Sequence, residues 1–232
     1  MKKEDLRDLL QRLGERYSEV LEIDLSDRSD GEVFKWFLAS LLFGAPITES
    51  AVIRTYNSFR AHSVLTPKRI LRTGWDGLVK ILDLGGYTRY DFKTADKLLI
   101  VSRNLSQKYN GSLTAINELS SDPHDLERRL KDLGKGIGEV TVSIFLRELR
   151  GIWKKADPYP TPITIAAAEQ LAIVEKKSSR DSALQQMKAF WQKNEIEGQS
   201  FVNFETAVLR FGKDYVRKNR CFPFPSGQYL VA

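Results

Sequence analysis

The stretch that decides the fold is residues 130–142, which reads LKDLGKGIGEVTV. A helix ends in this stretch, the turn Gly136-Ile137-Gly138 follows, and a second helix starts at once. Glycine permits a tight turn and a close approach of other groups to the backbone. Ile137 should point inward and lock the two helices together. The stretch therefore predicts two helices joined by a glycine-rich hairpin.

This hairpin is also a candidate ligand site. The N-terminus of the second helix offers backbone N–H groups that have no partner within the helix, and such groups suit a phosphate oxygen. Gly138 is expected to tolerate no Cβ, because the backbone must approach a phosphate and such a turn can require a positive φ. A structural helix–helix connection that binds no ligand is the alternative interpretation.

The rest of the chain also carries helical signals. Apolar residues recur at spacings of three and four, and Ser, Thr or Asp precedes several of these runs as a potential N-cap. The run in residues 31–42 is apolar on more than one face, which predicts a buried core helix. No alternating strand pattern of useful length occurs, so the predicted fold class is all-α. The predicted helices are approximately 6–13, 31–42, 48–59, 66–71, 75–82, 91–107, 122–130, 141–149, 163–174, 179–193 and 200–211.

The composition is that of a globular protein with a mildly basic charge balance. The chain has 232 residues, 42% of them hydrophobic, which is enough for one globular unit or two small lobes. Lys and Arg number 36 against 30 Asp and Glu, which gives a net charge of +6. Positive charge favours a polyanion such as nucleic acid, although many proteins with this charge bind none.

Cysteine content and hydropathy limit the location and the cofactors. With one cysteine, Cys221, the chain cannot form an internal disulfide, a four-cysteine metal site or an Fe–S cluster. We expect a reducing, cytoplasmic location, no metal and no cofactor. The charged N-terminus leads into no apolar segment, so we expect no signal peptide. The longest apolar run, in residues 37–46, is too short to span a bilayer, so we expect no membrane partner.

Three further motifs precede the hairpin in a definite order. They are residues 37–45 (FLASLLFGA), residues 83–87 (DLGGY) followed by a Lys-Thr-Ala helix at residues 93–98, and residues 109–113 (YNGSL). Together with the hairpin, this series resembles the helix-hairpin-helix DNA glycosylase superfamily, which includes endonuclease III. The hairpin is similar to the family's Leu-Pro-Gly-Val-Gly motif with one extra residue, and residues 37–45 look like the family's apolar helix that ends in a loop meeting DNA. The resemblance runs over residues 30–175.

The resemblance implies a two-lobed architecture. It predicts two helical lobes with a helix-hairpin-helix motif and a cleft between the lobes. One lobe should span residues 26–154, and the other should combine residues 1–25 with residues 155–232. The segment 157–162, which contains three prolines, is the expected crossing, because a proline disfavours helix at the residue before it.

The residues at the family's catalytic positions differ from its pattern. Val140 stands where lyase-active members have a lysine, and a valine cannot form a Schiff base. Pro162 stands where members have an aspartate, so Asp157, the nearest carboxylate, is the candidate catalytic residue. An Asp before Pro is also a common turn residue, which is the alternative for Asp157. Ala39 occupies the position of a glutamate that adenine glycosylases use, which argues against excision of adenine.

The C-terminal part, residues 211–224, is similar to the family's Fe–S loop with its cysteines replaced. Cys221 alone remains, and Phe222 and Phe224 are expected to fill the space as a small apolar core.

Three functions remain open on the sequence. The first is a monofunctional DNA glycosylase that flips and excises a damaged or mismatched base from duplex DNA as a monomer, without lysine-dependent lyase activity. The second is a non-catalytic DNA-binding protein that keeps the glycosylase scaffold. The third is an unrelated helical regulator whose hairpin contacts protein. For the DNA-binding functions, the expected contacts with double-stranded DNA come from the hairpin region and from the loop at residues 44–48: Lys135, Gly136, Ile137, Gly138, Val140, Thr141, Ala45 and Pro46.

Overall fold

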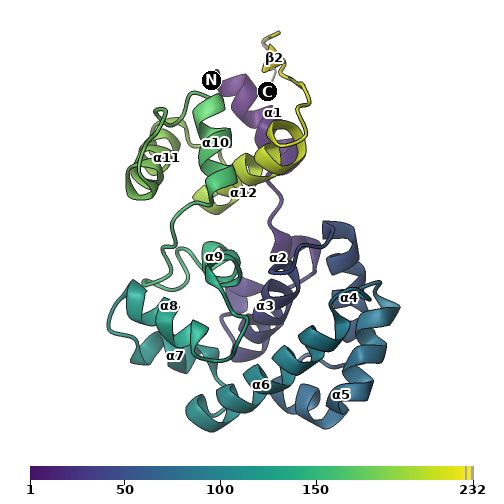
Figure 1. Cartoon of the computed structure of the whole chain (residues 1–232). Helices are drawn as coiled ribbons and strands as arrows, with labels where there is room; N and C mark the ends of the chain where they lie inside the picture. The colour runs from purple at the N-terminus through teal and green to yellow at the C-terminus, as the bar shows by residue number, and fades with distance from the viewer. Residues whose placement is uncertain (228, 231–232) are drawn as a thin grey trace. The chain divides into compact units, whose positions relative to one another are not determined.

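The computed structural model describes residues 1–227 and 229–230, and it confirms the predicted all-α class (Figure 1). The helices are α1 (Lys3–Leu13), α2 (Tyr17–Val20), α3 (Asp30–Phe43), α4 (Glu49–Ala61), α5 (Pro67–Leu84), α6 (Asp91–Tyr109), α7 (Leu113–Leu119), α8 (Pro123–Lys131), α9 (Glu139–Glu148), α10 (Pro162–Gln170), α11 (Arg180–Asn194) and α12 (Phe201–Phe211). A 3-10 turn, η1 (Leu25–Asp27), precedes α3, and a π-helical turn, η2 (Gly212–Val216), follows α12. Two short strands, β1 (Phe222–Pro223) and β2 (Tyr229–Leu230), pair antiparallel.

Side-chain caps explain where most of these helices begin. The hydroxyl of Thr66 accepts a hydrogen bond from the Arg69 N–H, and Pro67 follows at the first helical position, an arrangement that favours helix initiation. Ser200 and Asn203 form a reciprocal capping box at the start of α12, which satisfies two otherwise free backbone donors. Helix α3 differs slightly from expectation, because Ser29 caps it and Asp30 is its first residue.

The two helices predicted at residues 66–71 and 75–82 both lie in α5, where the non-helical backbone of Gly74 separates them. The φ angle of Gly74 is 69°, a conformation that glycine adopts easily and that breaks helical geometry. The predicted break between residues 71 and 75 is therefore a kink between two helical segments. The short helices α2 and α7 were not predicted, because each has too few residues to show a clear period.

The chain divides into two compact units, Met1–Val20 with Tyr159–Ala232, and Leu21–Pro158. The borders fall a few residues outside the predicted lobe 26–154, and one of them lies in the proline-rich segment. Each unit has its own core, and each is described by itself.

The unit of residues 21–158 is built around α3. Trp36, Phe37 and Ala39 are fully buried, which confirms the predicted core helix. The Trp36 Nε1–H donates to the Phe145 carbonyl oxygen at 2.9 Å, and the Phe37 and Phe145 rings pack edge to face. Figure 1 shows α3 between α9 on one side and α4 on the other. These contacts fix α9, and hence the end of the hairpin, on the core.

The unit of residues 1–20 and 159–232 packs α1, α10, α11 and α12 around a second apolar core. Phe222 and Phe224 are buried in it against Phe211, as predicted. The Arg12 guanidinium lies 4.0 Å from the centre of the Phe222 ring, a cation–π contact that covers the edge of this core.

No helix within residues 1–227 and 229–230 has the length and apolar character that crossing a membrane requires.

Candidate nucleic-acid interface

The hairpin between α8 and α9 is held by its apolar residues and by α6. Leu133 is fully buried and Ile137 is 6% exposed, so Ile137 points inward as predicted. The Asn104 Nδ2–H donates to the Leu133 carbonyl oxygen at 2.9 Å. A Cβ on Gly134 would lie 3.0 Å from the Val101 Cγ2, which shows how closely the hairpin backbone approaches α6.

The two outer glycines of the turn have different conformations, and this corrects the expectation for Gly138. Gly136 has a φ of 88°, whereas Gly138 has a φ of −96° and a ψ of −178°. The left-handed conformation that favours glycine is therefore at Gly136. Gly138 is the extended N-cap of α9, and no atom of the protein lies within 4 Å of a Cβ built on it. The fold itself does not require a glycine at position 138.

The loop at residues 44–46 is fixed beside the N-terminus of α9. A Cβ on Gly44 would lie 2.2 Å from the Thr141 Oγ1, so the Gly44 backbone packs directly against the Thr141 side chain. The Tyr87 hydroxyl, which is buried, donates to the Leu42 carbonyl oxygen at 2.7 Å and anchors the end of α3. Burial raises the pKa of Tyr87, so this hydroxyl remains a donor.

Side-chain burial separates several of the residues predicted to contact DNA into two groups. The side chains of Ile137 and Thr141 are buried, so they position the hairpin and the loop, and they can offer a ligand only their backbone groups. Lys135, Pro46 and Val140 are exposed, Val140 to 57%. The side chains that a large ligand can reach are those of this second group.

A groove joins the loop and the hairpin on the surface of α6. It has a volume of about 830 Å³, and its lining includes Gly44, Ala45 and Pro46 from the loop and Lys135 and Gly136 from the hairpin. Helix α6 and the residue before it supply the rest: Tyr90, Lys93, Thr94, Asp96, Lys97, Leu99, Ile100 and Arg103. Residues separated by about 90 positions thus line one concave surface.

Positive charge dominates this groove. Lys93, Lys97, Arg103 and Lys135 line it together with a single carboxylate, that of Asp96. Within the described part of the chain, none of the four cations forms an ion pair. Such a cluster attracts a polyanion. We did not predict Lys97 or Arg103, although Lys93 and Lys97 stand four residues apart on a helix and so share a face.

Lys97 lies against the hairpin turn. Its Cε would be 3.2 Å from a Cβ on Gly136, so its aliphatic chain packs where that glycine leaves space. Burial lowers the pKa of Lys97, because desolvation penalises the charged form. A phosphate in the groove would restore a favourable environment for the ammonium group.

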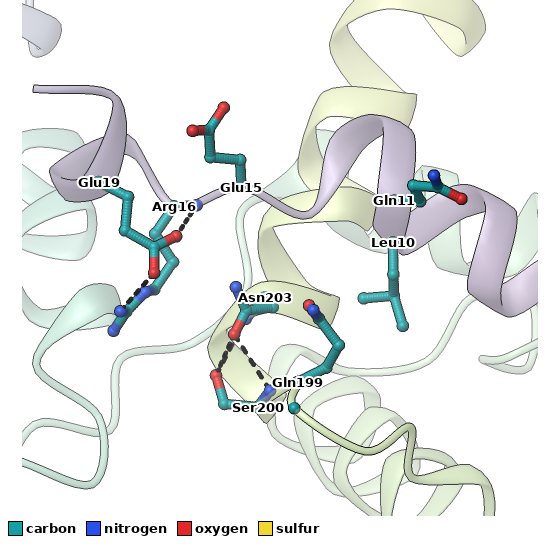
Figure 2. Close-up of a pocket in the computed structure, with 9 residues that line it drawn as sticks. Leu10, Gln11, Glu15, Arg16, Glu19, Gln199, Ser200 and Asn203 are labelled. Carbon is teal, nitrogen blue, oxygen red and sulfur yellow. Dashed lines mark hydrogen bonds and ion pairs between the residues drawn. The ribbon is translucent and has the colours of Figure 1, made fainter.

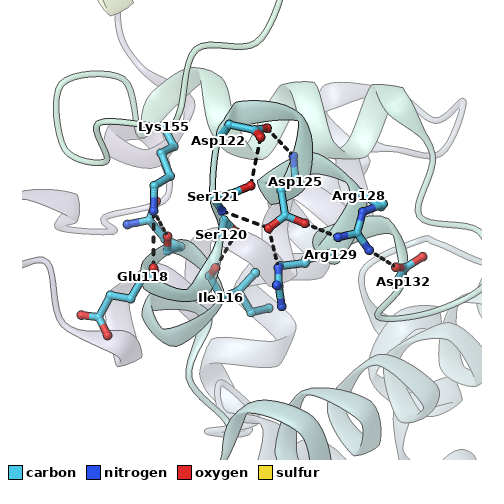
Figure 3. Close-up of polar contacts among 11 residues, drawn as sticks. Ile116, Glu118, Ser120, Ser121, Asp122, Asp125, Arg128, Arg129, Asp132 and Lys155 are labelled. Atoms are coloured by element: carbon cyan, nitrogen blue, oxygen red, sulfur yellow. Dashed lines mark hydrogen bonds and ion pairs between the residues drawn. The ribbon is translucent and has the colours of Figure 1, made fainter.

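The arginines of α8, unlike the four groove cations, pair with carboxylates among the described residues. Asp122 caps α8, and Asp125 accepts hydrogen bonds from the Ser121 N–H at 3.0 Å and the Arg129 Nε–H at 2.9 Å (Figure 3). Asp125 also pairs with Arg128. The hydrogen bond from Arg129, followed by that from Ser121, lowers the pKa of Asp125 to about 2. These arginines stabilise the first helix of the hairpin through internal pairs, unlike the groove cations.

Asp157, the candidate catalytic residue, is not among the groove-lining residues. Its carboxylate forms an ion pair with Arg150, whose side chain is 7% exposed and also donates to the Pro158 carbonyl oxygen. The pair closes the loop between α9 and the proline-rich segment. Asp157 thus performs at least the turn-stabilising role that was its alternative interpretation.

The unit of residues 1–20 and 159–232 contains a pocket of about 680 Å³ between α1, α2 and the start of α12 (Figure 2). Two pairs form among its charged and polar side chains. Arg16 donates to Glu19 at 2.6 Å, and the Ser200 hydroxyl donates to the Asn203 Oδ1 at 2.6 Å. Burial alone would raise the pKa of Glu19, but the hydrogen bonds from Arg16 lower it overall. This pocket lacks the excess of cations that the α6 groove has.

No protein-family model matches the chain, and no curated protein matches it.

Proposed function

We propose that this protein binds duplex DNA through the hairpin and the α6 groove and acts as a monofunctional DNA glycosylase that flips and excises a damaged or mismatched base. The observation that carries the proposal is the groove, where the predicted loop and hairpin meet four cations that have no ion-pair partner among the described residues. A basic concave surface beside the N-terminus of a helix matches the phosphate backbone. The same charges argue against the protein-binding regulator.

The contacts with DNA divide by type. Lys93, Lys97, Arg103 and Lys135 would bind phosphates, which positions the duplex without selecting its sequence. The N–H groups at the start of α9 would donate hydrogen bonds to one further phosphate. The exposed Pro46 on the loop would fill the space that a flipped base leaves in the duplex.

The proposed chemistry is hydrolysis of the N-glycosidic bond. Water adds to C1′ of the deoxyribose and loses a proton, while the base leaves with the bonding electrons and gains a proton. A carboxylate stabilises the positive charge that develops on the sugar. Asp157 is the candidate for that carboxylate. Val140 has no amine, so the product should be an intact abasic strand that breaks only in alkali.

The test is a panel of duplexes, each with one lesion or mismatch, assayed for base release with and without alkali. We expect alkali-dependent strand breakage for at least one substrate. Asp157→Asn should abolish release and leave duplex affinity unchanged, whereas the matched variant Asp181→Asn, at an exposed carboxylate on α11, should be fully active. Full activity of Asp157→Asn would remove Asp157 from the mechanism.

A specific observation favours the second candidate, a non-catalytic DNA-binding protein on the same scaffold. The Asp157 carboxylate is already paired with Arg150, whose side chain is 7% exposed, so a developing sugar cation would compete with a guanidinium for it. Duplex binding without base release from any lesion would establish this candidate in place of the glycosylase.

A further inference from the structure

Two aromatic side chains are exposed at the surface where α5 and α6 pack together. Trp75 is 37% exposed and Phe92 is 56% exposed, and their ring centroids are 5.0 Å apart at an interplanar angle of 47°. Large aromatic side chains gain free energy when they leave water. An exposed pair of this kind therefore marks a surface that a partner can cover.

A hydrogen bond holds the Trp75 side chain of this pair in place. The Trp75 Nε1–H donates to the Asp96 Oδ1 at 3.0 Å, which holds the indole against α6. Trp75 follows directly after the kink at Gly74. A ring held in one orientation loses little conformational freedom when a ligand stacks on it.

The aromatic pair adjoins the basic groove. Asp96, which holds the indole, lines that groove, and so does Lys93, which follows Phe92 in the chain. Phe92, Asp96 and Ile100 stand four residues apart on α6, so they form one stripe along the helix. Ile100 is also exposed and lines the groove. Cations and exposed apolar groups thus run side by side along α6.

Charge and ring chemistry together identify the occupant. The groove cations attract a polyanion, while the faces of the aromatic rings stack on flat apolar groups. In a duplex the base faces are stacked on each other, but in a single strand they are free to stack on aromatic side chains. We propose that the α6 surface also binds a single-stranded DNA segment, in place of a duplex, with phosphates on Lys93, Lys97 and Arg103 and bases stacked on Trp75 and Phe92. This inference extends the proposed function, because it rests on DNA being the partner.

Tryptophan fluorescence provides a direct test. The chain has four tryptophans, and the other three, Trp36, Trp153 and Trp191, are at most 6% exposed. Titration of the full chain with an undamaged single-stranded oligodeoxynucleotide should quench the emission of Trp75. Trp75→Leu should abolish the quenching and weaken binding about 5- to 150-fold, the effect expected for loss of one base–aromatic stack. Trp75→Phe should restore most of the affinity.

Matched variants separate stacking and charge from general effects. Phe92→Ala should weaken binding, whereas Leu119→Ala, at an exposed leucine on α7, should not. Lys97→Gln should reduce the slope of log affinity against log salt concentration by about 0.7, the value for one phosphate contact to a single strand. Lys108→Gln, on α6 but outside the groove, should leave that slope unchanged.

The outcomes distinguish this inference from the proposed function. Absence of quenching, unchanged affinity of Trp75→Leu, or equal quenching by an acidic polypeptide would overturn the single-strand site. The proposed function would survive any of these results, because duplex binding and base release are measured separately. Quenching with the expected variant effects would support the site even if no lesion is excised.

Discussion

Substitution of two neighbouring glycines by alanine tests the geometry of the hairpin most sharply. Gly136 and Gly138 are both exposed and lie on either side of the buried Ile137. Gly136 has a φ of 88°, and Gly138 has a φ of −96°. The same substitution two residues apart should therefore have different effects on the free energy of unfolding.

The expected magnitudes follow from the backbone. A left-handed conformation costs a residue with a Cβ about 1–2 kcal/mol, so Gly136→Ala should destabilise the protein by about that amount. The new Cβ would lie 3.2 Å from the Lys97 Cε, but a flexible lysine chain can move. Gly138→Ala should lower the free energy of unfolding by about 0.5 kcal/mol, because alanine is a poorer N-cap than glycine. It should also raise that free energy by about 0.4–1 kcal/mol, because alanine restricts the unfolded chain more than glycine does. The net change should lie within about 0.5 kcal/mol of zero.

Urea unfolding followed by far-ultraviolet circular dichroism measures both changes. Equal destabilisation by the two alanines would refute the assignment of the left-handed residue. Duplex binding provides the second readout: Gly138→Leu should preserve stability, because the space around its Cβ is open, but it should obstruct the approach of a phosphate. Affinity for all duplexes should fall about equally, and an unchanged affinity would make the hairpin purely structural.

Two further predictions concern Val140 and Asp125. Borohydride should not trap the protein on abasic DNA through position 140. Val140→Lys should allow trapping, because the side chain at this position is exposed and a lysine amine can form an imine. No gain in trapping would show that position 140 does not reach the sugar. The pKa of Asp125 is lowered from 3.8 to about 2, so its stabilising contribution is present above pH 3.8 and is lost as the pH falls toward 2. The urea midpoint of unfolding should decline over that pH interval, and Asp125→Asn should flatten the decline. The control variant Asp132→Asn, at an exposed carboxylate, should leave the decline unchanged. Equal pH profiles for the wild type and Asp125→Asn would contradict the lowered pKa of Asp125.

The all-α class and most helix positions were predictable from sequence because their causes are local. Spacings of three and four place apolar residues on one helical face, and caps such as Thr66 and Ser200 act within three residues. The hairpin was predictable for the same reason, since Ile137 between two glycines is a local pattern. The left-handed glycine was misplaced, because the sequence Gly-Ile-Gly permits positive φ at either glycine.

The groove was decided by tertiary packing. Gly44 meets Thr141, and Lys97 meets Gly136, across separations that no helical period connects. Packing also buried the Thr141 side chain, exposed Trp75 beside the cations of α6, and paired Asp157 with Arg150. A sequence period states which residues share a face of one helix, but it does not state which helices bring their faces together. That choice depends on the long-range fit of side chains such as Trp36 and Phe37 against Phe145, which joins α3 to α9.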